Sequence, residues 1–173
     1  WAKERSSRGG GQGGAPLKIR IVKGANLAME RVEASIKGWP QAPFETKAET
    51  DAQFMRMIHE GFKEENAAAV HIGVGSHNLF DIAYCLLLAS DRGVKECVTF
   101  EMLEGMNDPL CRVVQKLAGT MLLYCPVAKE EEFQTAVAYL IRRLDENTAP
   151  ENFLTHSFEL KVGSEAWRQE AER

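Results

Sequence analysis

The sequence has no long apolar run and no excess of positive charge. Its longest apolar stretch, around residues 82 to 89, is far shorter than the roughly 20 residues that a bilayer-spanning helix needs, so we expect no transmembrane segment. The formal net charge is -4, which provides no overall positive field to hold a phosphate backbone. Nucleic acid is therefore not expected as a partner, although a local anion site is compatible with this charge.

The sequence also has no closely spaced cysteines, no histidine cluster and no secretory signal. Cys85, Cys97, Cys111 and Cys125 form no CxxC pair, which favours reduced core thiols in a cytosolic protein over zinc ligands or a disulfide framework. The four histidines are scattered, so no metal site is predicted. The chain starts at Trp1 without an initiator Met, and WAKERSSRGG resembles the end of a helix. We therefore expect an internal piece of a longer protein.

Four short apolar runs alternate with segments of helical periodicity in this chain of 173 residues, 45% of them apolar and 27% charged. The predicted strands are the part of LKIRIVKGAN that stops at Lys23-Gly24, then AAAVHIGV, VKECVTFEM and TMLLYCPV. The predicted helices cover residues 25–38, 50–65, 77–93 and 108–117, and a last helix begins near residue 130. Strands that read as nearly continuous apolar runs between helices predict a parallel α/β sheet with crossover helices.

Four strand–helix units can form a small open sheet or half of an eight-stranded barrel, whose usual size is about 250 residues. The Gly-rich start, GGGQGGAP at residues 9–16, favours half a barrel. The predicted organisation is a helix end and connection over 1–16, the half-barrel over 17–155, and a polar lead-out over 156–173. In such folds, the chemistry lies where strands end and helices begin.

The last predicted helix carries the motif YLIRRLDEN at residues 139–147. The spacing i, i+3, i+4, i+7 places Tyr139, Arg142, Arg143 and Glu146 on one face. This face is either solvated, with an Arg142 to Glu146 pair, or it binds an anionic ligand.

The motif HIGVGSHN joins the second predicted strand to its helix. Gly73 and Gly75 allow a ligand to approach the backbone, and Ser76, His77 and Asn78 lie at a helix N-terminus that attracts anions. A dinucleotide fingerprint would need glycine in place of Asn78. The alternative is that Ser76 or Asn78 only caps the helix.

The first predicted strand carries two cations with open interpretations. Arg20 lies inside an apolar strand and needs a partner if it is buried, and alternation places Arg20, Val22 and Gly24 on one face, which in a barrel points into the lumen. Lys23 is a Schiff-base lysine, a flavin or phosphate contact, or a surface charge. Tyr124 closes the fourth predicted strand, and Leu103 lies just beyond the third. Each can also be an ordinary core residue.

Taken in order, IRIVKGANLAMERVE, ETKAETD, GSHN, FEMLEGM, LLYCPV and YLIRRLDEN resemble the second half of the proline dehydrogenase barrel, especially that of bifunctional bacterial proline utilisation flavoenzymes. The resemblance covers about residues 17–155. It implies the second half, four βα units, of a distorted (βα)8 TIM-type barrel. It further implies FAD as cofactor, L-proline as substrate, pyrroline-5-carboxylate as product and a quinone as electron acceptor.

The resemblance also implies residue roles, because the family's last helix lies over the mouth of the barrel. Arg142 and Arg143 would hold the proline carboxylate, since guanidinium groups give paired charge-assisted bonds. The predicted substrate contacts are completed by Tyr139, Tyr124 and Leu103. The predicted flavin contacts are Arg20, Val22, Lys23, Gly24, Lys47, His77, Asn78 and Glu146, with His77, Asn78 and Lys47 near the phosphate and adenosine parts.

The family's first four strands and the aldehyde dehydrogenase part of the bifunctional proteins have no counterpart in this sequence, so both are expected as partners. The implied location is the cytoplasm or the inner membrane surface. Two alternatives remain: a lyase or aldolase half-barrel that uses Lys23 as a Schiff base, and a noncatalytic piece that packs against the rest of its parent protein.

Overall fold

The computed structural model describes residues 1–7, 14–24, 27–41, 44–148, 150, 152–157 and 160–172. These residues form two compact units. Unit 1 consists of Trp1–Val22 and Gln53–Tyr124, and unit 2 consists of Lys23–Ala52 and Cys125–Arg173. Most of the Gly-rich connection expected at 9–16 lies outside the described residues, so the domain limits drawn from the sequence stay predictions.

Unit 1 contains one sheet of four parallel strands in the order β1-β2-β3-β4. The strands are β1 (Leu17–Val22), β2 (Val70–Gly75), β3 (Val98–Leu103) and β4 (Met121–Tyr124). All four were predicted, but β2 and β3 begin later than expected. The short helix α4 (Glu64–Ala67) takes the first alanine of the second apolar run, and a 3-10 turn, η1 (Lys95–Cys97), takes residues from the third.

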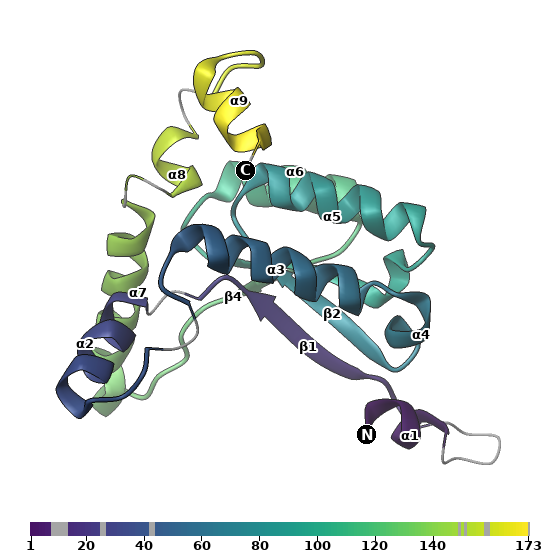
Figure 1. The fold of residues 1–173 in the computed structure, drawn as a ribbon, viewed down its shortest axis with the longest axis horizontal. Helices are drawn as coiled ribbons and strands as arrows, with labels where there is room; N and C mark the ends of the chain where they lie inside the picture. The colour runs from purple at the N-terminus through teal and green to yellow at the C-terminus, as the bar shows by residue number, and fades with distance from the viewer. Residues whose placement is uncertain are drawn as a thin grey trace. The chain divides into compact units, whose positions relative to one another are not determined.

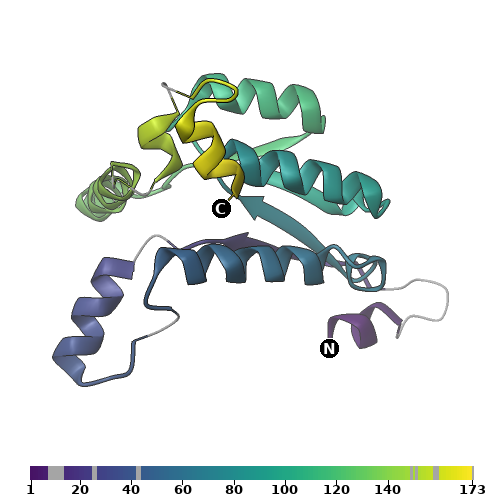
Figure 2. The same cartoon turned by 45° about the horizontal axis from the view of Figure 1, so that its top comes forward.

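The longer helices of unit 1 run lengthwise along the sheet (Figure 1; Figure 2). They are the part of α3 (Lys47–Gly61) from Gln53 onward, α5 (Leu79–Asp91) and α6 (Asp108–Ala118). Unit 1 also contains the short helices α1 (Ala2–Ser7) and α4. Asn78 and Asn107 accept hydrogen bonds from the first turns of α5 and α6, and Gly119 ends α6 with φ +78°. These caps explain why α6 begins at the predicted residue and ends within one residue of the prediction, whereas α5, predicted over 77–93, begins only after its cap Asn78.

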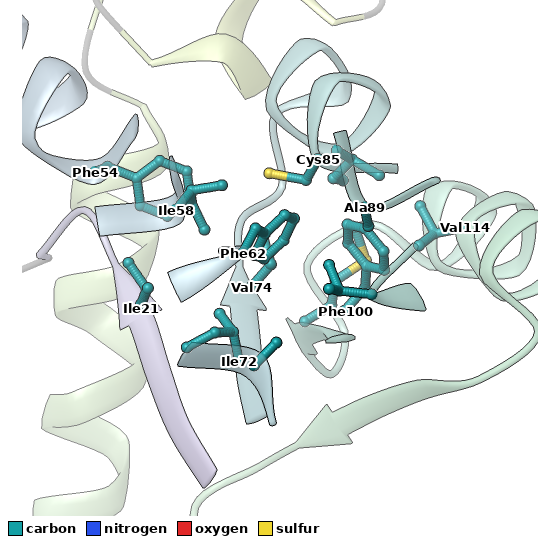
Figure 3. Packing of buried hydrophobic residues seen from close by; sticks show 14 of the residues in the cluster. Ile21, Phe54, Ile58, Phe62, Ile72, Val74, Cys85, Ala89, Phe100 and Val114 are labelled. Carbon is teal, nitrogen blue, oxygen red and sulfur yellow. The ribbon is translucent and has the colours of Figure 1, made fainter. Parts of the chain in front are cut away.

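The core of unit 1 lies between the sheet and its crossover helices (Figure 3). The strands contribute alternate residues to it, α3 contributes the fully buried side chains of Phe54 and Ile58, and Phe62 follows just after α3. The strand residues in the core are Ile21, Ile72, Val74, Phe100 and Met102. Because strand residues alternate between faces, the intervening residues lie on the other face of the sheet.

The strand order never reverses along the sheet. Crossover connections in parallel sheets are almost always right-handed, so helices stay on one face only while each new strand is added on the same side of the last one. Barrels are built in this way, whereas a doubly wound sheet reverses and has helices on both faces. The predicted α/β parallel architecture of barrel type is therefore confirmed.

Unit 2 contains helices and no strand among its described residues. They are α2 (Leu27–Lys37), the first turns of α3, the 3-10 turn η2 (Glu130–Glu132), α7 (Phe133–Asn147), α8 (Phe153–His156) and α9 (Glu165–Glu172). The helix expected to start near residue 130 thus begins as a 3-10 turn, and the polar lead-out contains α9. Within the described ranges, no helix is long and apolar enough to cross a membrane.

Candidate functional site

One face of the sheet in unit 1 is polar and carries several of the predicted site residues. It is the face opposite the core, and the strand register aligns its members across all four strands. We call it the polar sheet face: Lys18, Arg20, Val22, His71, Gly73, Gly75, Thr99, Glu101, Leu103, Leu122 and Tyr124. In a barrel, this face points into the lumen.

A buried carboxylate lies at the centre of the polar sheet face. The side chain of Glu101 in β3 is only 1% exposed. Arg20 Nε donates a hydrogen bond to Glu101 Oε2, and Lys18 Nζ lies 2.8 Å from Oε1. Both cations come from β1, so Glu101 reaches across β2 to find them. Arg20 is exposed and not buried, and it pairs with Glu101, a residue that the sequence analysis did not select.

Two further residues hold this arrangement in place. Gly73 in β2 leaves room for the carboxylate, because a Cβ at this position would lie 2.2 Å from Glu101 Oε1. The guanidinium of Arg20 lies over the ring of Tyr124 in β4, 4.3 Å from its centroid, which is a cation–π contact. Four strands thus contribute to one charged cluster, which we call the Arg20 cluster: Lys18, Arg20, Gly73, Glu101 and Tyr124.

The predicted alternation beyond Val22 is wrong. Strand β1 ends at Val22, and Gly24 has φ +87°, a left-handed conformation that glycine adopts readily. Gly24 therefore lies in a turn and not on the face that Arg20 and Val22 share.

In unit 2, two of the predicted cofactor residues meet at an aspartate. Lys23 Nζ lies 3.0 Å from Asp51 Oδ1, and Lys47 Nζ lies 2.7 Å from Oδ2. Burial raises the pKa of Asp51, but the two ammonium groups outweigh it and hold the pKa below its usual value. Thr46 and Glu49 form a capping box that starts α3 and places Lys47 one turn before Asp51. The two lysines are thus fixed as a cationic pair around one anion.

His77 lies in the turn between β2 and α5 and reaches the neighbouring strand. Its Nε2 accepts a hydrogen bond from the backbone N–H of Leu103 at 3.2 Å. The neutral ring therefore carries its hydrogen on Nδ1. Nδ1 is buried and has no hydrogen-bond partner in the described part of the chain. Burial also lowers the pKa of His77, so the neutral form is favoured.

The N-terminus of α5 beside His77 is held by its own side chains. Asn78 Oδ1 accepts from the N–H of Phe80, and Ser76 Oγ donates to Asp81 Oδ2 at 2.8 Å. The capping role considered for Asn78 is therefore observed. It does not exclude a contact to a ligand, because one cap satisfies only some of the free N–H groups at a helix start.

His77 should make stability depend on pH. Its folded-state pKa lies below the unfolded value of about 6.5. Below about this unfolded value, the unfolded state therefore binds more protons. The stabilisation is complete above it and is lost as the pH falls from it through the lower folded-state pKa. Below about pH 6.5, we expect the unfolding free energy of the parent to fall relative to that of His77→Gln. The glutamine amide oxygen can accept a hydrogen bond from the same N–H. Urea unfolding at several pH values measures this, and a difference independent of pH would contradict it.

In unit 2, α7 carries the arginine motif. Tyr139, Arg142 and Arg143 are half-buried, and the guanidinium of Arg143 lies 4.4 Å from the ring centroid of Tyr139. Arg142 Nε is buried without a hydrogen-bond partner among the described residues. The side chain of Glu146 lies outside the described part of the chain. On the opposite face of α7, the apolar side chains of Phe133 and Leu144 are, by contrast, more than half exposed.

The sequence analysis missed two acidic residues, Glu101 and Asp51, although signals for both are present. Glu101 is a lone charge between Phe100 and Met102 in a predicted buried strand, the same signal that pointed to Arg20. Asp51 follows Lys47 at i+4 on a predicted helix. Leu103 and Tyr124, the predicted substrate contacts of unit 1, both lie on the polar sheet face, and Leu103 is buried.

Comparison with known proteins identifies the family of this chain. Residues 1–156 match the proline dehydrogenase family. This chain belongs to the proline dehydrogenase family. It is 32% identical over 145 residues, 80% of its length, to the bifunctional protein PutA of Klebsiella aerogenes, and 30% identical over 153 residues, 86% of its length, to that of Rhizobium meliloti.

Solved structures of family members have the same fold. Proline utilization A from Bdellovibrio bacteriovorus, inactivated by N-propargylglycine, matches 84% of this chain with a TM-score of 0.74 and 35% identity. A mutant of the Bradyrhizobium japonicum protein matches 91% with a TM-score of 0.72 and 25% identity. The chain covers 15% and 16% of these two structures, and 11% and 12% of the curated relatives above. It therefore spans about a tenth of the curated relatives' length.

Proposed function

We propose that this proline dehydrogenase segment forms part of an FAD-dependent enzyme that oxidises L-proline to pyrroline-5-carboxylate and passes the electrons to a quinone. The observation that carries the proposal is the Arg20 cluster. It holds a guanidinium on the sheet face that would line the barrel lumen, with the terminal nitrogen atoms available to a ligand. We also propose that the full-length protein contains the rest of a barrel and an aldehyde dehydrogenase part. It would lie in the cytoplasm or at the inner membrane surface.

The described residues fit FAD, which combines a planar aromatic flavin ring with an anionic diphosphate. Arg20 uses Nε for Glu101, and its terminal nitrogen atoms have no hydrogen-bond partner among the described residues. His77 has an unpartnered Nδ1 hydrogen beside the start of α5. Lys23 and Lys47 add positive charge in unit 2. Bound FAD would supply the acceptor for a hydride, and a nearby guanidinium would stabilise the negative charge of its reduced form.

We assign the residues of this chain as follows. Arg142 and Arg143 bind the substrate carboxylate, and the unpartnered Arg142 Nε supports this role. Tyr139, Tyr124 and Leu103 contact the proline ring. Arg20, Val22, Lys23 and Gly24 belong to the flavin-ring site, and Lys47, His77, Asn78 and Glu146 to the rest of the cofactor.

The reaction balances with these groups and an external base. Proline loses a hydride from the ring carbon beside its nitrogen and a proton from that nitrogen, and a C=N bond forms. The hydride takes both electrons with it, bound FAD would be their acceptor, and the proton leaves to solvent. Arg142 and Arg143 contribute by orientation, because a carboxylate held at two points fixes the ring relative to its acceptor.

A Schiff-base mechanism at Lys23 is not supported. A Schiff base needs a neutral amine as nucleophile, usually an amine that is desolvated or close to another cation. Lys23 Nζ lies instead 3.0 Å from the carboxylate of Asp51, which favours the charged ammonium.

The test uses the full-length protein that contains this segment. We expect it to purify with flavin absorbance between 350 and 500 nm (about the usual flavin range), to bleach anaerobically with L-proline and to remain oxidised with D-proline. N-propargylglycine, which shares the carboxylate and secondary amine of proline, should inactivate it as it did the Bdellovibrio relative. Absence of flavin, or of proline-dependent bleaching in the flavin-loaded protein, would overturn the proposal. Borohydride trapping of a substrate on Lys23 would favour the lyase.

A further inference from the structure

Glu101 is a buried carboxylate inside a parallel strand, where a charge is costly unless it is paired. Its neighbours Phe100 and Met102 point into the core, while its own side chain lies on the polar sheet face and is 1% exposed. Core packing therefore does not explain an acid at this position. An apolar residue of similar size would avoid the desolvation cost.

The contacts of Glu101 are directional. Oε2 binds Arg20 at Nε, the inner nitrogen of the guanidinium, and Oε1 faces Lys18 Nζ at 2.8 Å. The guanidinium carbon of Arg20 lies over the ring of Tyr124. The contacts at Nε and at the ring restrict the orientation of the guanidinium, and the hydrogen bond to Glu101 uses Nε and not the terminal nitrogen atoms.

The ends of the two cations are accessible although the acid is not. The side chains of Lys18 and Arg20 are 43% and 39% exposed. One carboxylate between two cations leaves one positive charge uncompensated. The Arg20 cluster therefore presents a single, oriented positive charge to a ligand bound on the polar sheet face.

We infer that Glu101 is a positioning residue that orients Arg20 toward the flavin ring and sets how much positive charge the flavin meets. This inference rests on the proposed function. The reduced cofactor has gained a hydride and carries one more negative charge than the oxidised cofactor. Positive charge beside it favours reduction, and the carboxylate of Glu101 limits that effect.

The test is the equilibrium between the bound flavin and a redox dye of known potential, in the full-length protein. Glu101→Gln keeps the size of the side chain and removes its charge, so the equilibrium constant for two-electron reduction should rise about tenfold, which is about 30 mV. Arg20→Met should lower it by a similar factor. Lys116→Met, an exposed cation on α6 against the other face of the sheet, is the control and should leave it unchanged within twofold.

The outcomes separate this inference from the proposed function. Flavin content and bleaching by proline are measured first in the parent, and failure there overturns the proposed function. If the parent passes and Glu101→Gln only lowers the melting temperature, with the dye equilibrium within twofold of the parent, Glu101 is merely structural and the inference is wrong. If Glu101→Gln does not retain flavin, Lys18→Met decides, because its side chain is accessible. Lys18→Met should lower the equilibrium constant for flavin reduction about threefold, and an unchanged constant would overturn the inference.

Discussion

Arg142→Met and Arg143→Met are each expected to lower kcat/KM for proline about 10- to 150-fold in the full-length enzyme. Removing one guanidinium leaves a desolvated carboxylate short of a charged hydrogen bond, which costs about 1.5 to 3 kcal/mol. At about 1.4 kcal/mol per factor of ten, this range gives the stated loss. Arg→Lys at either position should recover only part of it, because an ammonium cannot form the planar fork.

Two measurements and a control variant distinguish this effect from a loss of structure. Flavin content and melting temperature should stay near those of the parent, since both side chains are only half-buried. Arg112→Met, at an exposed position of α6, is the matched control and should change neither kinetics nor stability by more than about 0.5 kcal/mol. If both α7 variants behave like this control, the YLIRRLDEN face is an ordinary solvated face and the substrate assignment fails with it.

The sequence predicted the sheet well because its signals are local. Apolar runs of strand length, caps such as Asn107 and terminal glycines such as Gly119 act within a few residues, so the four strands and their helices could be placed. The errors lie at the element ends. Lys95–Cys97 carries no strong breaker, and only the structure shows that a 3-10 turn precedes β3.

The candidate site was harder to predict because its decisive contacts join residues far apart in the chain. Arg20 and Glu101 are 81 positions apart, and no period or motif links them. A search for lone charges in apolar strands finds each of them singly, but only the parallel register shows that a glycine lies between them on β2. The bond between His77 and Leu103 depends in the same way on β2 and β3 being adjacent.

Gly73→Ala is expected to destabilise the protein by about 2 to 4 kcal/mol, although the same change in a strand often stabilises. Alanine in place of a glycine that has an ordinary backbone conformation usually gains about 0.4 to 1 kcal/mol, because the unfolded chain loses freedom. Gly73 is not among the glycines with positive φ, so the backbone itself tolerates alanine. The added Cβ, however, would lie 2.2 Å from Glu101 Oε1 and 2.7 Å from Cδ.

The carboxylate can avoid this Cβ only by leaving Lys18 and Arg20, and a charge-assisted hydrogen bond is worth about 1.5 to 3 kcal/mol. A double-mutant cycle isolates this cause. In a Glu101→Ala background the obstacle is gone, so Gly73→Ala should cost less than about 0.5 kcal/mol or stabilise. Urea unfolding of the parent, both single variants and the double variant measures the coupling. Additive effects would mean that Gly73 is required for a reason other than the carboxylate, and the account of the Arg20 cluster as one interlocked unit would then be wrong.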